Sequence, residues 1–383
     1  MIDRIKELAD RYYEDFVEIR HHLHKHPELS KQEFNTSKYI ASLLSDWGIE
    51  YQEGIAGTGI LGIIKNDDMG SRNIALRADM DALPILEKND VPYKSKHEGI
   101  MHACGHDVHM TCLLGASRIL QEIRGELKGS IKLIFQPTEE SYPGGAKPMI
   151  EAGVLENPAT ASILGQHVFP ELDAGKVGMR PGKYMASTDE IFLTIKGKGG
   201  HGAIPDKVID PVLISAHIIL ALQQIVSRNA SPTMPTVISF GKIHTEGKTN
   251  IIPDEVKVEG IMRTFDEGWR AEIKRRITTI SQSIAEGMGG TCEVFIDQGY
   301  PVLKNDEALT LKTRKRSEAY LGRENVVDLD LRMTAEDFAY FARELPGCFY
   351  RLGTRNESKN IVSNLHINNS DEEEKRIRKG SGV

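Results

Sequence analysis

Several absences narrow the classes of protein to which this 383-residue chain can belong. The chain has only four cysteines, which are widely scattered and give no disulfide framework: Cys104, Cys112, Cys292 and Cys348. It has no basic excess, because 48 Lys and Arg face 55 Asp and Glu, and this charge argues against a nucleic-acid partner. No run approaches about 20 apolar residues, and the N-terminus lacks an apolar signal core. We therefore expect a cytoplasmic protein that neither spans a membrane nor binds nucleic acid.

What the chain contains is a globular composition and a length that favours two or three domains. Four short runs are almost entirely apolar and are separated by helical or loop segments: "TGILGIIK", "NIALRADMDALP", "SIKLIFQPTEE" and "ASILGQHVF". Runs of this kind are typical of strands that are buried on both faces of a parallel sheet. The main fold is therefore predicted to be α/β with a mostly parallel sheet.

Helix boundaries are marked by a few local signals. Ser30 precedes Glu33 by three residues, which is the spacing of a capping box at the start of a helix. Gly105 is placed to make the turn into a helix, and Asp210 followed by Pro211 is a typical helix start. Thr334 can cap a further helix.

The pattern changes at about residue 185, where strands that alternate between apolar and polar residues begin. Two helices interleave with them, so the order over about 110 residues reads β-α-β-β-α-β. This order predicts a small α+β, ferredoxin-like domain inserted into the larger one. The predicted division is residues 1–184 and 296–383 for the main domain and 185–295 for the inserted domain.

The stretch "MHACGHDVHM" (residues 101–110) concentrates histidine and cysteine before a predicted helix. A zincin motif would need glutamate directly after the first histidine, and Ala103 stands there instead. Cys104 and His106 remain able to bind one metal ion or to bridge two. From these residues alone, a metal site and a buried polar turn are both possible interpretations.

A pair of carboxylates, Glu139 and Glu140, follows the apolar run of residues 131–135 and a proline. Such pairs usually mark a solvated face, but this one is placed at the carboxyl end of a predicted strand. Because neighbouring extended residues point in opposite directions, one carboxylate can bind a metal while the other handles a proton. His167 in "GQHVF" and His366 in "NLHIN" also follow strand-like runs, and their joint placement favours a common metal site over four unrelated structural residues.

Eight motifs, in this order, resemble the M20 metallopeptidase family: "RADMDALP", "MHACGHDVH", "FQPTEE", "GQHV", "KGKGGHGAIP", "NIIPD", "RTF" and "EDFAYF". The resemblance runs from about residue 10 to His366. It is strongest to the amidohydrolase branch, which includes hippurate hydrolases, N-acyl-amino-acid amidohydrolases, N-acetyldiaminopimelate deacetylases and plant auxin-conjugate hydrolases. It implies a di-metal hydrolase domain and an inserted lid or dimerisation domain.

The resemblance also implies roles for individual residues of a site with two divalent metal ions per subunit. Glu139 would be the general acid and base. The metal ligands would be Cys104, His106, Glu140, His167 and His366, with Cys104 in the bridging position. Asp79 and Asp81 would orient these ligands. Manganese or zinc is expected first, and cobalt or nickel would also suit these donor atoms.

The remaining implied residues lie in the inserted domain. His201 would stabilise the oxyanion, commonly in the active site of a partner subunit, so a homodimer through this domain is expected. Asn250 and Arg263 would hold the substrate's carboxylate, a role for which the arginine fork is well suited. A surface salt bridge is the alternative for Arg263.

The implied reaction is hydrolysis of a small N-acyl amino acid, such as an N-acetyl or N-benzoyl derivative, to a carboxylic acid and an amino acid. Two alternatives stay open. One is an M20-type dipeptidase, which would prefer a substrate with a free amine. The other is a metal-binding relative without catalytic activity.

Overall fold

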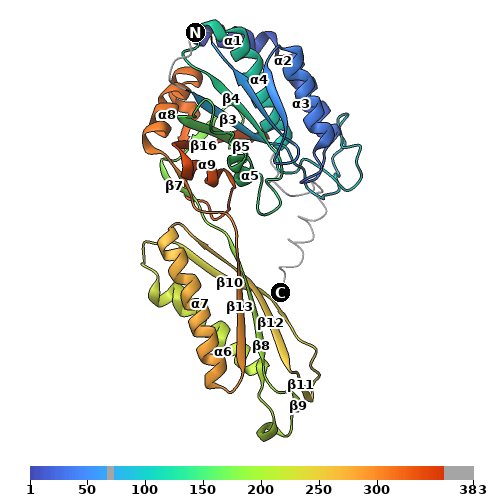
Figure 1. Ribbon diagram of the computed structural model, residues 1–383, viewed down its shortest axis with the longest axis vertical. Coiled ribbons are helices and arrows are strands. Elements are labelled where there is room, and N and C mark those ends of the chain that lie inside the picture. The colour runs from blue at the N-terminus through green and yellow to red at the C-terminus, as the bar shows by residue number, and fades with distance from the viewer. Residues whose placement is uncertain (67–72, 358–383) are drawn as a thin grey trace. The chain divides into compact units, whose positions relative to one another are not determined.

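A computed structural model describes residues 1–66 and 73–357, and these fall into two compact units (Figure 1). The first unit comprises Met1–Gly182, Asn305–Leu329 and the described residues from Tyr340 onward. The second comprises Lys183–Lys304 and Asp330–Ala339. Each unit has its own sheet and its own hydrophobic core.

The first unit is built on an eight-stranded sheet in the order β1-β2-β4-β3-β5-β16-β6-β15. Its strands are β1 (Glu50–Ile55), β2 (Gly59–Ile64), β3 (Ile74–Asp79), β4 (Ile131–Gln136), β5 (Ser162–Asp173), β6 (Val177–Met179), β15 (Val326–Asp328) and β16 (Gly347–Arg355). The pairs β3–β4, β3–β5, β5–β16 and β6–β15 are parallel, which confirms the predicted mostly parallel sheet. The run "TGILGIIK" does form a strand, β2, but it pairs antiparallel with β4.

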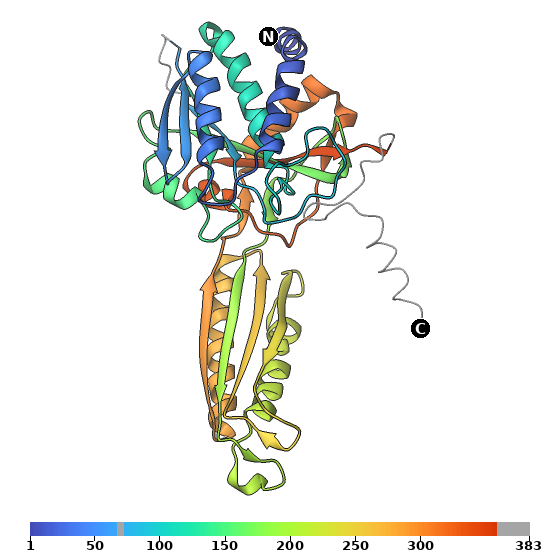
Figure 2. The same ribbon diagram turned by 90° about the vertical axis from the view of Figure 1, so that its right-hand side faces the viewer.

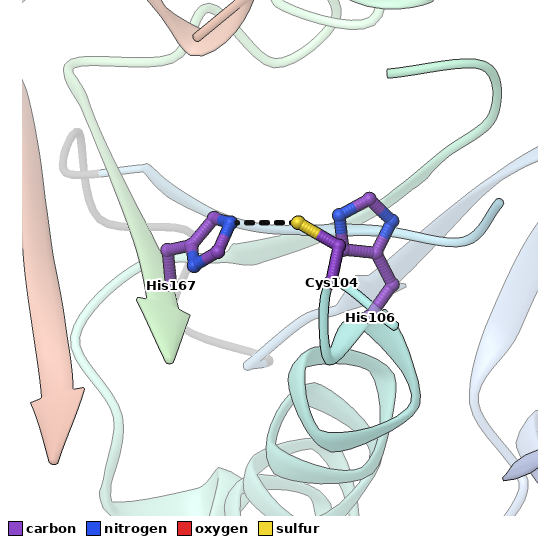
Figure 3. A group of neighbouring side chains, drawn as sticks. All are labelled: Cys104, His106 and His167. Atoms are coloured by element: carbon purple, nitrogen blue, oxygen red, sulfur yellow. Dashed lines mark hydrogen bonds between the residues drawn. The ribbon is translucent and has the colours of Figure 1, made fainter. Parts of the chain in front are cut away.

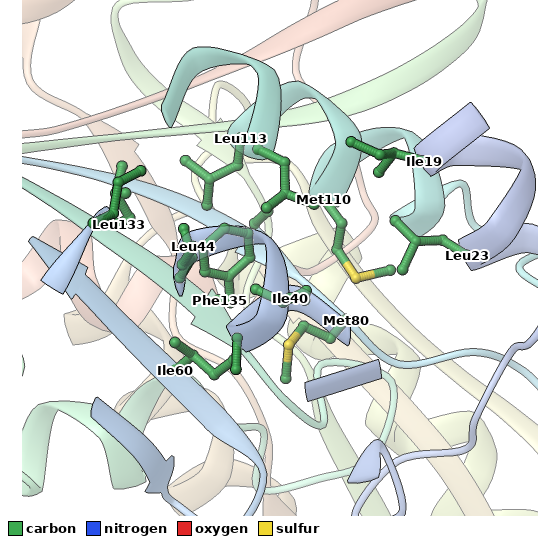
Figure 4. Close-up of a cluster of buried hydrophobic side chains, with 14 of the residues drawn as sticks. Ile19, Leu23, Ile40, Leu44, Ile60, Met80, Met110, Leu113, Leu133 and Phe135 are labelled. Atoms are coloured by element: carbon green, nitrogen blue, oxygen red, sulfur yellow. The ribbon is translucent and has the colours of Figure 1, made fainter. Parts of the chain in front are cut away.

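Helices cover this sheet and close its core. They are α1 (Ile2–Arg11), α2 (Tyr13–Lys25), α3 (Phe34–Asp46), α4 (His106–Glu122), α5 (Ala146–Glu151), α8 (Glu307–Leu321) and α9 (Phe338–Glu344). Figure 4 shows side chains of α2, α3 and α4 packed against β2 and β4, including Leu23, Ile40, Met110, Ile60 and Phe135. Every residue of β4 is buried, because this central strand is covered on both faces.

Two of the predicted helix starts are confirmed. Gly105 precedes α4 with a φ of 85°, a conformation that glycine adopts without steric cost. The Asp210 side chain accepts hydrogen bonds from the backbone N–H groups of Val212 (2.8 Å) and Leu213 (3.1 Å).

Two other predicted caps are wrong. The Ser30 hydroxyl donates to Asp81 Oδ2 at 2.7 Å instead of capping a helix, and α3 begins only after Glu33. Helix α9 begins at Phe338, four residues beyond Thr334. The spacing of residues along the sequence cannot distinguish a helix-capping hydroxyl from one that donates to a carboxylate distant in sequence.

The second unit is a four-stranded antiparallel sheet in the order β10-β12-β8-β13, with two helices on one face (Figures 1 and 2). Its main elements are β8 (Asp189–Lys196), α6 (Pro211–Gln224), β10 (Thr236–His244), β12 (Glu255–Thr264), α7 (Glu267–Gly287) and β13 (Thr291–Gln298). Short strands β9 (Gly200–His201) and β11 (Ile251–Ile252) pair at one corner, and β7 (Gly182–Met185) pairs with β14 (Leu303–Asn305).

Helix α6 and the π-helical turn after it form one apolar stretch of 19 residues, Pro211–Asn229. By length and composition alone this stretch could cross a membrane. Its buried side chains, among them Ile214, Ile218 and Leu222, belong to the core between the helices and the sheet. About a third of the stretch, 33%, is buried in this way.

Candidate metal centre

The first unit gathers its candidate site at one edge of the sheet. In the register of β3 with β4, Asp79 lies opposite Gln136, which is the last residue before the turn that carries Glu139 and Glu140. Strand β5 lies on the other side of β3 and contributes His167. Helix α4 begins at His106. Because the carboxyl ends of neighbouring parallel strands share an edge, residues distant in sequence meet here.

Three predicted ligands form one buried group. Cys104, His106 and His167 each place a candidate ligand atom within 4.8 Å of the other two. Figure 3 shows Cys104 and His106 at the start of α4 and His167 on β5, with Cys104 Sγ directed at His167 Nε2 at 3.3 Å. All three side chains are buried.

Hydrogen bonds fix which nitrogen each histidine turns to this group. His106 Nδ1 lies 2.8 Å from the backbone oxygen of Asp81, and His167 Nδ1 lies 2.8 Å from that of Val168. A carbonyl oxygen can only accept, so each Nδ1 is the donor and each Nε2 is the nitrogen left to bind a metal ion. Within the described residues, His106 Nε2 is buried and has no hydrogen-bond partner. This arrangement is typical of histidines that bind a metal.

The two glutamates approach the same place. Glu139 and Glu140 each place a carboxylate oxygen within 4.8 Å of a His106 nitrogen. The distance from Glu140 Oε1 to His106 Nε2 is 3.7 Å. The backbone N–H of Glu140 donates to Asp81 Oδ2 at 2.9 Å, so Asp81 contacts both the glutamate turn and, through its carbonyl oxygen, His106.

Asp79 and His109 form the layer behind these groups. His109 Nδ1 lies 2.6 Å from Asp79 Oδ1, and His109 Nε2 accepts the backbone N–H of Val168 at 2.8 Å. Arg77 pairs with the other oxygen of Asp79 at 2.7 Å. Both nitrogens of His109 are therefore used within the protein, and His109 holds α4 to β5 beside His167.

Burial and neighbouring charges shift the pKa values of Cys104, His106 and His167. Burial raises the pKa of the Cys104 thiol well above its ordinary value, although His106 opposes this. Burial opposes a charge on His106, but Asp79, Cys104 and Asp81 together outweigh it and raise the pKa of His106 well above its usual range. Burial lowers the pKa of His167 well below its ordinary value. A bound cation would take the place of the protons on Cys104 and His106.

The donor set fits divalent metal ions. It combines a thiol, two imidazole Nε2 atoms and two carboxylates in a mostly buried group, and the Nε2 atom of His106 has no hydrogen-bond partner among the described residues. Sulfur and imidazole suit zinc, and the carboxylates widen the choice to manganese, cobalt and nickel. The fifth predicted ligand, His366, lies outside the described residues.

The other predicted site residues lie in the second unit, at two separate places. His201 pairs with Ile251, and the N–H of Gly202 donates to the backbone oxygen of Asn250 at 2.9 Å, so His201 and Asn250 share one corner. This corner adjoins the Glu255 end of β12, because Gly199 donates to Asp254.

Arg263 lies near the opposite end of β12, about 27 Å from Glu255 at about 3.4 Å per residue. There it lines a cavity of about 530 Å³ with Val237, Ile261 and residues 331–334. One chain therefore does not bring Arg263 together with His201 and Asn250.

Sequence reasoning missed two residues of this region. His109 lies in the same decapeptide as Cys104 and His106, so its three-residue spacing from His106 was an available signal. Glu33 is fully buried and accepts the backbone N–H of Thr138, directly before the glutamate pair, at 2.8 Å. No sequence signal connects residue 33 with residue 138.

Comparison with known proteins shows which family this chain belongs to. Residues 75–383 match the family described as Peptidase family M20/M25/M40. The chain is 42% identical to N-acetyl-L-cysteine deacetylase of Bacillus subtilis, covering 88% of this chain and 80% of that protein. It is 40% identical to N-acyl-L-amino acid amidohydrolase of Geobacillus stearothermophilus, covering 80% of this chain and 82% of that protein.

A solved structure shares the fold across both chains. The Bacillus subtilis YXEP protein, described as a dinuclear metal binding peptidase from the M20 family, superposes with a TM-score of 0.79. It is 34% identical and covers 93% of each chain. The site geometry, the family match and the relatives agree, and the chain belongs to peptidase family M20/M25/M40.

Proposed function

We propose that this protein is a metal-dependent amidohydrolase that cleaves the amide bond of N-acyl amino acids. The observation that carries the proposal is the buried group of Cys104, His106 and His167 beside Glu139 and Glu140, with a His106 Nε2 that has no hydrogen-bond partner among the described residues. The names of the two amidohydrolase relatives support the substrate class. The products are a carboxylic acid and a free amino acid.

Each residue of the cluster has a proposed role. Cys104, His106, Glu140, His167 and His366 would hold two divalent ions. The thiolate favours zinc, and manganese, cobalt or nickel would also be accepted. When bound, such ions lower the pKa of a coordinated water and polarise the amide carbonyl.

Glu139 moves the protons of the reaction. It lies directly before the proposed ligand Glu140 and is only 8% exposed, so its carboxylate acts in a site from which bulk water is largely excluded. It takes a proton from the attacking water and later gives it to the leaving nitrogen. His201 donates to the developing oxyanion, and Asn250 and Arg263 bind the substrate's carboxylate.

The separation along β12 supports a homodimer formed through the inserted domain, predicted at residues 185–295. A small substrate cannot reach both ends of this strand in one chain. We therefore propose that Arg263 and the pair of His201 and Asn250 act from different subunits, with the oxyanion role taken by the partner subunit's His201.

This arrangement can be tested by mixing two inactive variants, Glu139→Gln and His201→Ala, under conditions that exchange subunits. Half of the dimers should become hybrids with one intact site each, which restores about a quarter of the wild-type rate. If mixing restores no activity although hybrids form, His201 acts within its own subunit or has no role in the reaction.

The function itself is tested by removing metals with a chelator, reloading with zinc, manganese, cobalt or nickel, and assaying N-acetyl, N-benzoyl and longer N-acyl amino acids. We expect release of the amino acid only after reloading. A dipeptidase would instead prefer dipeptides with a free amine, and a relative without catalytic activity would release nothing from either class. A cytoplasmic location remains a prediction.

A further inference from the structure

The turn that carries Glu139 and Glu140 is attached to the protein by hydrogen bonds on both sides of Glu139. On one side the N–H of Glu140 donates to Asp81 Oδ2 at 2.9 Å. On the other side the N–H of Thr138 donates to Glu33 Oε1 at 2.8 Å. Two buried carboxylates therefore hold the backbone directly before and after Glu139.

The Glu33 carboxylate bonds to this turn and does not cap helix α3. It is fully buried immediately before α3, yet its side chain makes no capping bond to that helix. Its second oxygen accepts the hydroxyl of Thr58 at 2.7 Å, and the Thr138 hydroxyl lies 3.3 Å from the first. Burial raises the pKa of Glu33. A buried carboxylate is costly unless donors satisfy it, and here Thr58 and Thr138 supply them.

Thr138 needs this support, because its φ is 59°, in the left-handed region that β-branched residues rarely adopt. The Thr138 hydroxyl also accepts the N–H of Lys31 at 3.0 Å, so the segment before α3 holds both its backbone and its side chain. Strained backbone of this kind persists only where its surroundings fix it. Without Glu33, Thr138 would relax and rotate the peptide that carries Glu139.

We propose that Glu33 is a positioning residue: it holds Thr138 in the left-handed conformation and thereby fixes the direction of Glu139 and Glu140. This inference rests on the proposed function, in which Glu139 transfers the protons and Glu140 binds metal. Glu33 acts through the turn and touches neither substrate nor metal.

The test compares three variants. Glu33→Ala removes the acceptor of the Thr138 N–H, and we expect kcat to fall about 10²-fold with KM near the wild-type value, as for an acid misplaced by about 1 Å. Glu33→Gln should restore kcat to within a few-fold, because its amide oxygen still accepts from Thr138 and its amide group can donate to Thr58. Thr58→Val is the matched control: it disturbs the same buried carboxylate but leaves the turn attached.

A second measurement requires no substrate. Titration of the metal-free protein with cobalt(II) alone should show about 10–100-fold weaker binding in Glu33→Ala, since Glu140 follows the same turn, and near-normal binding in Glu33→Gln and Thr58→Val. If the wild type hydrolyses no N-acyl amino acid, the proposed function fails, and the cobalt titration still decides the role of Glu33. Glu33→Leu replaces the alanine variant if that variant does not fold.

The proposal is overturned if Glu33→Ala and Thr58→Val behave alike in kcat and in cobalt affinity, because Glu33 would then contribute only to stability. It is also overturned if Glu33→Gln loses as much as Glu33→Ala, because the negative charge would then matter and not the bond to Thr138.

Discussion

Both units bury polar and charged side chains, but they differ in whether the protein itself supplies all the hydrogen-bond partners of these side chains. In the second unit, Arg270 pairs with both oxygens of Asp189 at 2.7 and 3.0 Å and also donates to the backbone oxygens of Thr188 and Gly299. Lys274 adds a further contact to Asp189 at 2.7 Å. In the first unit, His106 Nε2 is equally buried and meets no hydrogen-bond partner within the described residues.

This difference separates a structural ion pair from a binding site. Burial of a charge says little about function, because a charge with complete contacts is stable as it is. A buried polar atom whose contacts are incomplete needs an explanation, and a ligand is one. The Arg270 cluster is complete from its own residues, whereas the cluster around His106 needs a cation.

The largest effect should come from Glu139 in the incomplete cluster. Glu139→Gln keeps the size of the side chain but cannot take a proton, so we expect a loss of about 10²–10⁴-fold in kcat with metal content unchanged. Glu140→Gln is the matched control, which should lose metal. Metal analysis and steady-state kinetics check both variants, and near-normal turnover in Glu139→Gln would contradict its assignment.

A substitution in the Arg270 cluster should lower the stability of the protein instead of its activity. Arg270→Ala leaves the buried Asp189 with Lys274 as its remaining ion-pair partner among the described residues, so the free energy of unfolding should fall by about 3–5 kcal/mol. Cobalt affinity should not change, because the described partners of Arg270 include no proposed metal ligand. Urea unfolding and cobalt titration measure the two quantities, and a loss of metal without a loss of stability would remove the contrast between the clusters.

Much of the fold could be predicted from hydrophobic pattern. The four apolar runs became β2, β3, β4 and β5, and the Asp210–Pro211 start of α6 was correct because the signal is local. The antiparallel direction of β2 could not be read, since an apolar run carries no information about strand direction. Ser30 failed as a cap because Asp81, 51 residues away, accepts its hydroxyl.

The candidate site, too, could be predicted from the sequence only in part. Cys104 and His106 could be singled out because they lie two residues apart, and the resemblance to a family linked them with Glu139, Glu140 and His167. The structure adds what spacing cannot supply: the Nδ1 bonds that direct His106 and His167, and the two carboxylates that hold the glutamate turn. Such contacts join segments that are far apart in sequence.

A smaller effect should follow when the support of the metal cluster is removed without touching a proposed ligand. Asp81→Ala deletes the acceptor of the Glu140 N–H and should weaken cobalt binding about 10–100-fold. Ser30→Ala removes only one bond to the same carboxylate and should change the affinity less. Equal losses in the two variants, measured by cobalt titration, would mean that the bond from Glu140 has no special role.

The smallest effect should be a pH dependence of stability at His24 in the first unit, where both ring nitrogens have protein partners. His24 lies between two buried carboxylates, with Nδ1 2.8 Å from Asp107 and Nε2 3.1 Å from Glu87, while Arg20 faces Asp107 from the same helix. Burial opposes the charge, but Asp107 outweighs it and raises the pKa of His24. Its contribution to stability is therefore full below the unfolded pKa of about 6.5 and is lost as pH rises through the folded pKa.

The measurement is the difference in unfolding free energy between wild type and His24→Gln across this pH range, which should shrink as pH rises. His21, on the same helix, is the control with the opposite sign, because burial and Arg20 lower its pKa. The difference between wild type and His21→Gln should grow as pH rises toward about 6.5. If the free-energy difference changes with pH in the same direction for both pairs, the carboxylates around His24 do not hold its proton. The contacts of His24 would then not be satisfied within the protein as those of Arg270 are.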